Sequence, residues 1–134
     1  MGDLAITFSV VPWSDRAADD LRLIADVTER DISVFRWAVA NAEMQLWAVW
    51  EDGARIGSVI WSVEREPDGI TIVINAAAVY ARNGGAFDAI WAAFIGLGRA
   101  IRARTVTCWT ERAGLARLLE RRGASFKYVA QVKL

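Results

Sequence analysis

The sequence predicts a single α/β domain, built on a mixed β-sheet with helices on both faces. Three patterns support this fold class: apolar alternation typical of strands, apolar spacing typical of amphipathic helices, and tight-turn signals between them. The chain has 134 residues, of which 54% are hydrophobic, enough for one domain with a substantial core. We expect this domain to span residues 1–134 in the order β-α-α-β-β-β-α-β-α-β.

The first half of the chain predicts a strand, two helices and a hairpin. The segment "AITFSVVPW" is expected to form a strand that ends at Pro12. Ser14 is expected to cap a helix that runs to about Val27, and a second helix follows over residues 31–42. Two strands then flank Asp52-Gly53, a dipeptide typical of tight hairpins.

The second half is expected to complete the sheet. A turn at residues 67–69 leads into an apolar strand at 70–80, of the kind that is covered on both faces. A helix follows Gly84-Gly85, and a strand follows at 105–110, which should run parallel to the strand at 70–80. A short helix ending at Gly123 and one strand in the tail "SFKYVAQVKL" complete the order.

Composition excludes several kinds of site. The chain has no histidine and one cysteine, Cys108, so it has no histidine-based catalytic pair, no histidine metal site and no internal disulfide. We expect no metal. No apolar run reaches the length of a membrane span, and the N-terminus does not resemble a signal peptide, so we expect a cytoplasmic protein.

Charge is divided unevenly along a chain whose net charge is zero. Residues 1–81 carry six basic and thirteen acidic side chains, and residues 82–134 carry ten basic and three acidic ones. The basic half could serve an anionic ligand or head-to-tail packing of identical subunits, or the charges could be an ordinary surface. The neutral total disfavours nucleic acid as a partner.

Two glycines stand where the apolar strand passes into the next helix. The start of a helix presents unpaired N–H groups and a partial positive charge, which together bind phosphate, and glycine lets the phosphate approach closely. In one interpretation a phosphate binds the backbone N–H groups of this segment, which are those of Arg82, Asn83, Gly84, Gly85 and Ala86. In the other, the glycines only allow the chain to turn.

Three segments in order, "WEDGARIGSVIWSV", "AAAVYARNGGAFDAIWAAF" and "RLLERRGASF", resemble the hairpin, the central strand with its phosphate loop, and the last helix of the GNAT family of acyl-CoA N-acyltransferases. This resemblance implies transfer of an acetyl or similar acyl group from acetyl-CoA to a primary amine. It further implies that residues 82–86 bind the pyrophosphate. The strand end, with Ala77, Ala78 and Val79, would pair with the pantetheine.

The sequence departs from the family pattern at two places. In the phosphate loop pattern Gln/Arg-x-x-Gly-x-Gly/Ala, one register puts Ala81 at the first position and the other puts Phe87 at the last. The tyrosine that commonly protonates the CoA thiolate in the family would fall at Leu119. Tyr80 is the candidate to replace it, with packing as the alternative. Glu111 is the candidate general base, with a helix-start carboxylate as the alternative.

A second function from a different class fits the same sequence. The missing tyrosine, the divided charge and the seven tryptophans also suit a GNAT-fold protein without catalysis, whose partners are proteins or copies of itself. The sequence resembles small GNAT-like proteins of tailed bacteriophages, some of which are virion components. Binding of acetyl-CoA separates the two hypotheses.

Overall fold

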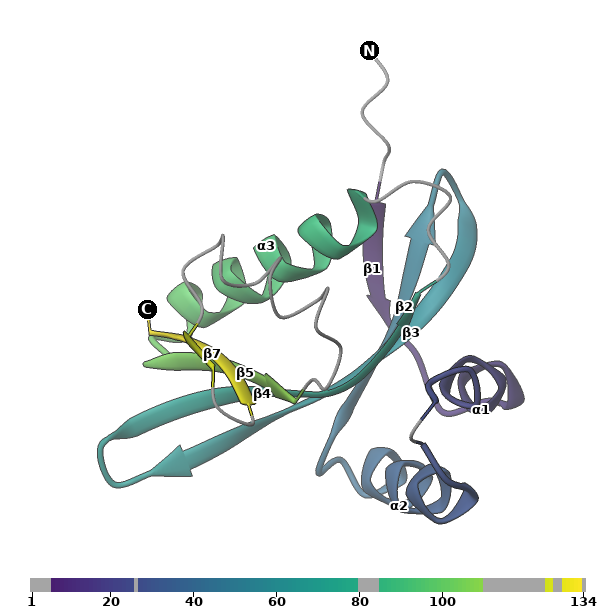
Figure 1. Cartoon of the computed structure of the whole chain (residues 1–134), viewed down its shortest axis with the longest axis horizontal. Helices are drawn as coiled ribbons and strands as arrows, with labels where there is room; N and C mark the ends of the chain where they lie inside the picture. The colour runs from purple at the N-terminus through teal and green to yellow at the C-terminus, as the bar shows by residue number, and fades with distance from the viewer. Residues whose placement is uncertain (1–5, 26, 80–84, 110–124, 127–128, 134) are drawn as a thin grey trace.

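The computed structural model describes residues 6–25, 27–79, 85–109, 125–126 and 129–133. Within these residues, seven strands form one sheet on which helices pack (Figure 1). In chain order the elements are β1 (Ile6–Val10), α1 (Asp15–Leu21), α2 (Glu29–Ala40), β2 (Gln45–Glu51), β3 (Ala54–Glu66), β4 (Gly69–Val79), α3 (Gly85–Ala100), β5 (Thr105–Trp109), β6 (Ser125–Phe126) and β7 (Val129–Lys133).

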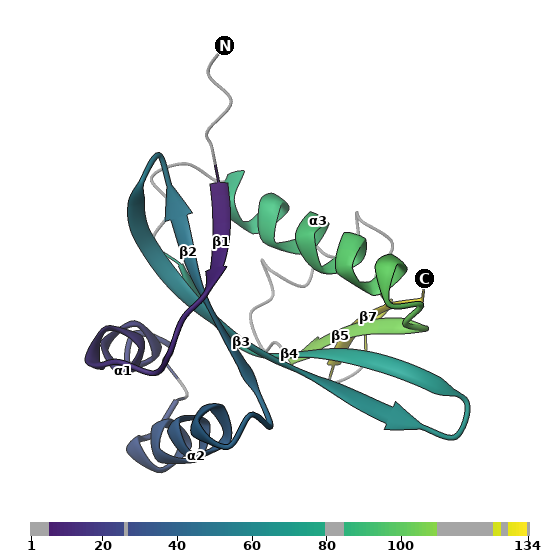
Figure 2. The same cartoon turned by 180° about the vertical axis from the view of Figure 1, so that it is seen from behind.

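The sheet is mixed, as the sequence predicts. Its strand order is β1-β2-β3-β4-β5-β7-β6. Strands β4 and β5 are the one parallel pair among the described strands, because α3 connects them and returns the chain to the same end of the sheet. The other neighbouring strands are antiparallel. The long β3–β4 hairpin forms the centre of the sheet and projects beyond the helices at its turn (Figure 2).

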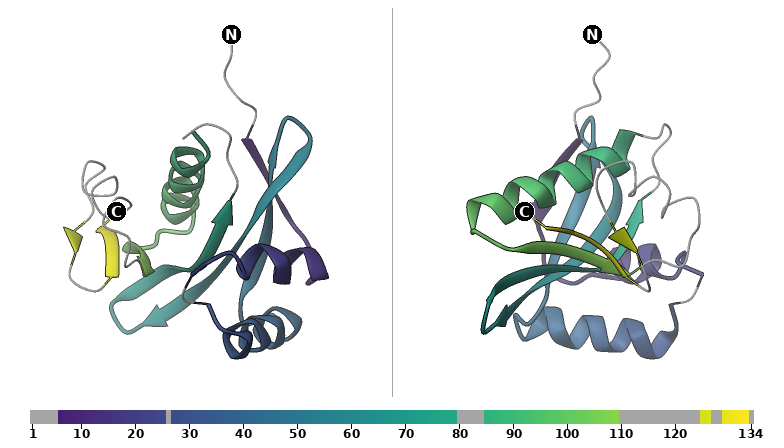
Figure 3. Two further views of the ribbon diagram at one scale, coloured as in Figure 1. Left: turned by 45° about the vertical axis from the view of Figure 1, so that its right-hand side comes forward. Right: turned by 60° about the vertical axis from the view of Figure 1, so that its left-hand side comes forward.

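Helices cover both faces of the sheet. Helix α3 lies on one face, and α1 and α2 lie on the other, which is visible from two further directions in Figure 3. Phe94 and Trp91 of α3 are buried against the sheet, and the Phe94 ring stacks on Trp47 of β2 with centroids 4.8 Å apart. Complete burial of one such aromatic side chain contributes about 2–3 kcal/mol, so this contact anchors α3.

The opposite face has its own apolar core. Leu21 of α1 and Ile32 of α2 pack with Leu46 of β2 and Ile60 of β3. These four side chains are at most 6% exposed. The two-sided burial explains why β4 is a nearly continuous run of apolar residues.

Local chemistry sets the turns and helix starts. Asp52 and Gly53 have φ of 50° and 84°, the two positive values of a type I′ turn, so the predicted hairpin is confirmed. Thr28 and Asp31 form a capping box, in which each side chain accepts a hydrogen bond from the other residue's backbone N–H. This cap starts α2 two residues before the position that the sequence predicts.

Two expected elements differ from the structure. Helix α1 ends at Leu21 instead of about Val27, since backbone turns over the next residues carry the chain to the Thr28 cap. Ser14 stands at the helix start, but its side chain makes no capping hydrogen bond. The tail forms two antiparallel strands, β6 and β7, instead of one. The helix expected before Gly123 lies outside the described residues.

Candidate functional site

The candidate site lies where the parallel strands β4 and β5 part. Their ladder pairs Thr71 with Thr105 at one end and Ile74 with Cys108 at the other. Strand β4 continues beyond this ladder to Val79 and stays paired with β3 as far as Gly57. Within the described residues, the β5-facing edge of β4 over residues 76–79 therefore has no strand partner. Its backbone N–H and C=O groups are placed to bind an extended ligand.

Three residues of the predicted pantetheine site lie on this free stretch. Ala77 is exposed, Ala78 is buried at 6% exposure, and Val79 is half-buried against the core on the α3 side. Their small or apolar side chains offer no chemistry of their own. Any contribution they make to binding comes from the backbone.

Strands β3 and β4 approach each other very closely beside this stretch. A Cβ atom on Gly57 would lie 2.2 Å from the carbonyl oxygen of Ala78. The Ile56-Gly57 pair belongs to a segment that resembles the GNAT hairpin, and here glycine has a clear physical reason. It lets the two backbones lie together at the border of the site.

Helix α3 begins close after the free end of β4. Gly85 is its first residue, and Ala86, the second, is buried at 1% exposure. The 16 residues of α3 give its N-terminus a full macrodipole, and Asp88 lies in the first turn. Arg82, Asn83 and Gly84 of the predicted phosphate loop lie outside the described residues, as do Tyr80 and Glu111.

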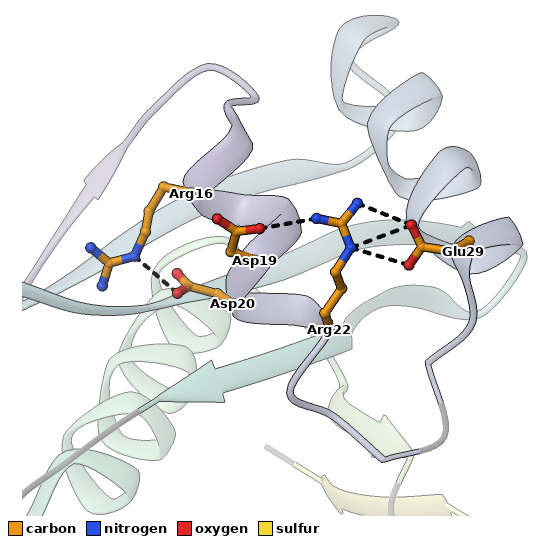
Figure 4. A network of polar contacts seen from close by, with 5 residues as sticks. All are labelled: Arg16, Asp19, Asp20, Arg22 and Glu29. Carbon is orange, nitrogen blue, oxygen red and sulfur yellow. Dashed lines mark hydrogen bonds and ion pairs between the residues drawn. The ribbon is translucent and has the colours of Figure 1, made fainter.

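A buried polar network holds α1 against β3, next to the stretch of β4 that has no β5 partner. Ser58, which pairs with Ala78, donates to Asp20 Oδ2 at 2.6 Å, and Arg16 donates to Asp20 Oδ1 at 2.9 Å. Figure 4 shows Arg16 and Asp20 meeting along α1. Asp20 is 2% exposed and Ser58 is fully buried, so the paired hydrogen bonds are what makes burial of a carboxylate tolerable.

Two arginines complete this network. Arg55 donates to Ser58 Oγ at 3.1 Å, and Arg16 donates to the Arg55 carbonyl at 2.8 Å. Partial burial lowers the pKa of the Arg55 guanidinium, an effect that the Asp20 carboxylate opposes. The network ties α1 to β3, and its Ser58 is the register partner of Ala78 on β4.

A separate ion cluster joins α1 to α2 at the surface. Arg22 binds Glu29 through both carboxylate oxygens and also binds Asp19, as Figure 4 shows. This contact lowers the pKa of Glu29 and raises that of Arg22. All three side chains are exposed, so the cluster contributes little stability.

The surroundings of Cys108 disfavour a nucleophilic role. This residue is 9% exposed, and burial raises the pKa of its thiol to about 11. The described residues contain no group of three or more metal-ligating side chains, and none of the described helices has the length and apolar character to cross a membrane.

Asn75 is the site residue that the sequence reasoning did not single out. It interrupts an apolar strand at the position where the pairing of β3 and β4 shifts register. Asparagine is uncommon in strands, and its presence in this apolar strand is the feature of the sequence that could have marked it as a site residue.

The chain has the fold of GNAT acetyltransferases. A candidate GNAT acetyltransferase from Desulfovibrio desulfuricans gives a TM-score of 0.75 at 16% identity, over 96% of this chain and 99% of its own. A Bacillus subtilis acetyltransferase in complex with CoA gives 0.72 at 14% identity, over 98% and 99%. Arabidopsis thaliana Naa50 with the bisubstrate analogue CoA-Ac-MVNAL gives 0.69 at 11% identity, over 97% and 99%.

The likeness lies in structure alone. No protein-family model matches the sequence, and no curated protein does. At these identities the comparison supports the predicted fold and leaves the reaction to be argued from the residues of this chain.

Proposed function

We propose that this chain, whose fold is that of the GNAT acetyltransferases, is an acyl-CoA-dependent N-acyltransferase. It would transfer an acetyl or similar acyl group from acyl-CoA to a primary amine. The observation that carries the proposal is the stretch of β4 beyond Ile74, which has no partner on its β5 side within the described residues and leads toward the start of α3.

Two features of that stretch suit acyl-CoA. The pantetheine arm contains two amide groups, which pair with free backbone groups as a short strand does. The pyrophosphate is a dianion, which the N-terminal end of a 16-residue helix attracts. Residues 82–86 would supply the N–H groups for that contact.

In the proposed reaction the amine nitrogen attacks the thioester carbonyl carbon. A C–N bond forms, the C–S bond breaks, the amine nitrogen loses one proton, and the CoA thiolate takes up one. A backbone N–H of β4 would stabilise the negative charge that develops on the carbonyl oxygen. Tyr80, or a water molecule, would protonate the thiolate, and Glu111 would receive the proton from the amine.

Titration calorimetry with acetyl-CoA tests this function. We expect micromolar binding by the wild-type protein and at least about tenfold weaker binding by Gly84→Glu, because the added carboxylate repels the pyrophosphate. Ala92→Glu is the matched control, since it adds the same charge at an exposed position farther along α3. Absence of binding at millimolar acetyl-CoA would overturn the proposal.

A second function is favoured by one observation. Trp37 and Val34 lie three residues apart on α2 and are 57% and 48% exposed. An exposed tryptophan beside an apolar residue is common at protein interfaces. If acetyl-CoA does not bind, we propose an assembly protein that works through protein contacts, in a virion or another complex. Trp37→Ala should then reduce its association, measured by sedimentation.

A further inference from the structure

Asn75 stands at the point where β4 separates from β5. The β3/β4 ladder skips it, because Ile74 and Ala76 pair with consecutive residues of β3. The β4/β5 ladder has its last pair at Ile74 and Cys108. Asn75 is therefore a bulge residue directly beside the opening between the parallel strands.

The bulge also reverses which face the side chains of β4 occupy. Ile74 packs in the core under α3, whereas Ala76, two residues later, packs in the core under α1 and α2. Regular alternation would have kept both on one face. The reversal is a built feature of the strand at the proposed site.

Two contacts fix the amide group of Asn75. Its Nδ2 donates to Ser62 Oγ at 2.9 Å and, more weakly, to the Val73 carbonyl oxygen at 3.4 Å. A carbonyl oxygen only accepts, so the second contact settles which end of the amide is nitrogen. Asn75 Oδ1 then points away from these partners, and no described residue donates a hydrogen bond to it.

The amide of Asn75 is unusual for its surroundings. The remaining side chains of β4 are apolar except Thr71, whose hydroxyl is bonded to Thr105. Asn75 is half-buried and lies at the opening between the parallel strands. A ligand at the opening would supply a donor for its Oδ1.

We propose that Asn75 Oδ1 accepts an N–H of the acceptor amine and thereby directs the nitrogen lone pair at the acyl carbonyl. This inference rests on the proposed acyltransferase function and deepens it. It makes the acceptor a primary amine that binds in its neutral form, beside the β4 bulge.

The chemistry of an amide suits this role better than that of a carboxylate. A neutral amide oxygen favours the ammonium ion, which has no lone pair and cannot attack, much less than a carboxylate does. Because the amide nitrogen is held by Ser62, its oxygen is oriented before the amine arrives, which reduces the entropy lost on binding.

The titratable groups on the neighbouring elements do not compete with the Asn75 amide for the amine. Cys108 of β5 has a pKa raised to about 11 and is neutral at physiological pH. Asp20 of α1 is held by Ser58 and Arg16. Glu64 of β3 pairs with Thr71, farther down the strand, and is exposed.

The test uses three amine probes: propylamine, putrescine and tri-alanine with a free α-amine. Release of CoA from acetyl-CoA is followed with a thiol reagent, after subtraction of the rate without enzyme. Acetyl-CoA affinity is measured for every variant by calorimetry, and stability by urea unfolding. The variants are Asn75→Ala, Asn75→Asp and, as the control that keeps the Asn75 oxygen, Ser62→Ala.

We expect Asn75→Ala to lower kcat/KM for the amine about tenfold, with acetyl-CoA affinity unchanged. Asn75→Asp should move the acidic limb of the kcat profile about one pH unit upward, because the carboxylate raises the pKa of the bound amine. Ser62→Ala should reduce the rate less and leave that limb in place.

Three results would overturn the inference. One is an unmoved acidic limb in Asn75→Asp together with unchanged kcat/KM in Asn75→Ala, which would make Asn75 structural. Another is that the wild-type protein binds acetyl-CoA but acylates none of the three probes. That result would remove the proposed role of Asn75 but not the proposed acyl-CoA site. The third is no acetyl-CoA binding at all, which removes the proposed function as well.

Discussion

Gly57 of β3 lies against the backbone of Ala78 so closely that no side chain fits between them. A Cβ atom on Gly57 would be 2.2 Å from the Ala78 carbonyl oxygen and 2.7 Å from the Val79 Cα. Both contacted atoms are backbone, which cannot rotate aside as a flexible side chain can. The free stretch of β4 is thus held in place from its β3 side by a contact that only glycine permits.

We therefore predict that Gly57→Ala destabilises the protein by about 2 kcal/mol or more, because β3 and β4 must move apart. Urea unfolding measures this loss. In the same experiment Gly96→Ala should stabilise by about 0.5–1 kcal/mol, since alanine favours helix and a Cβ at this position in α3 meets nothing within 4 Å. Equal stability of Gly57→Ala and wild type would contradict the close contact.

The buried pair of Asp20 and Ser58 yields a second prediction. Ser58→Ala removes a donor from a carboxylate that is 2% exposed, and we expect a loss of about 1–3 kcal/mol in the free energy of unfolding. Asp20→Ala should cost at least as much, since Arg16 and Ser58 both lose their acceptor. The double variant should cost less than the sum by about 1 kcal/mol or more. Strict additivity would show that the two residues do not interact.

Much of the fold is encoded locally and could be predicted from the sequence. The Asp52-Gly53 turn follows from the preference of these residues for positive φ. The burial of Trp91 follows from its place on the apolar face of a helix. The parallel pairing of β4 and β5 follows from the helix that connects them.

Features that depend on distant partners could not be predicted in this way. The early end of α1 follows from the path of the chain to the Thr28 cap and from the contacts between α1 and α2. The bulge at Asn75 exists only in relation to the register of β3. Apolar alternation treats residues 70–80 as one regular strand, so it could not show the reversal of faces.

The candidate site could be predicted in part. Ala77, Ala78 and Val79 lie on β4 beside the opening, as the resemblance implies, because a strand followed by a helix fixes that geometry. The binding roles of these three residues stay predictions, as do those of Tyr80, Glu111 and residues 82–86. Asn75 could be recognised as a site residue only from the structure, because its place in the site depends on where β5 separates from β4.

Two helix ends provide a third prediction. Ala42 and Arg102 have φ of 59° and 58°, and each occupies the left-handed position of a Schellman motif at the end of α2 or α3. Glycine accepts this conformation without strain, so Ala42→Gly and Arg102→Gly should each stabilise by about 0.5–1 kcal/mol in urea unfolding.

The control for this pair is the same substitution inside a helix. Ala92→Gly, at an exposed position within α3, should destabilise by about 1 kcal/mol. If all three variants lose stability equally, the two helix ends do not carry the strain that their φ values indicate.

The thiol of Cys108 gives a final prediction that bears on mechanism. Burial raises its pKa from 9.0 to about 11. Raised in this way, the thiol contributes stability that is fully present below pH 9 and is lost as the pH rises through about 11. The wild-type protein should therefore lose more stability than Cys108→Ala over this interval.

The same shift makes the native thiol slow to react. At pH 8 the thiolate fraction is about 100-fold smaller with a pKa near 11 than with the unperturbed value of 9.0, and the side chain is only 9% exposed. Labelling by iodoacetamide should thus be at least about 100-fold slower in the native protein than in urea. Rapid native labelling would contradict this burial and show that Cys108 reaches solvent as a thiolate, and a covalent acyl-cysteine route would then have to be tested beside direct attack by the amine.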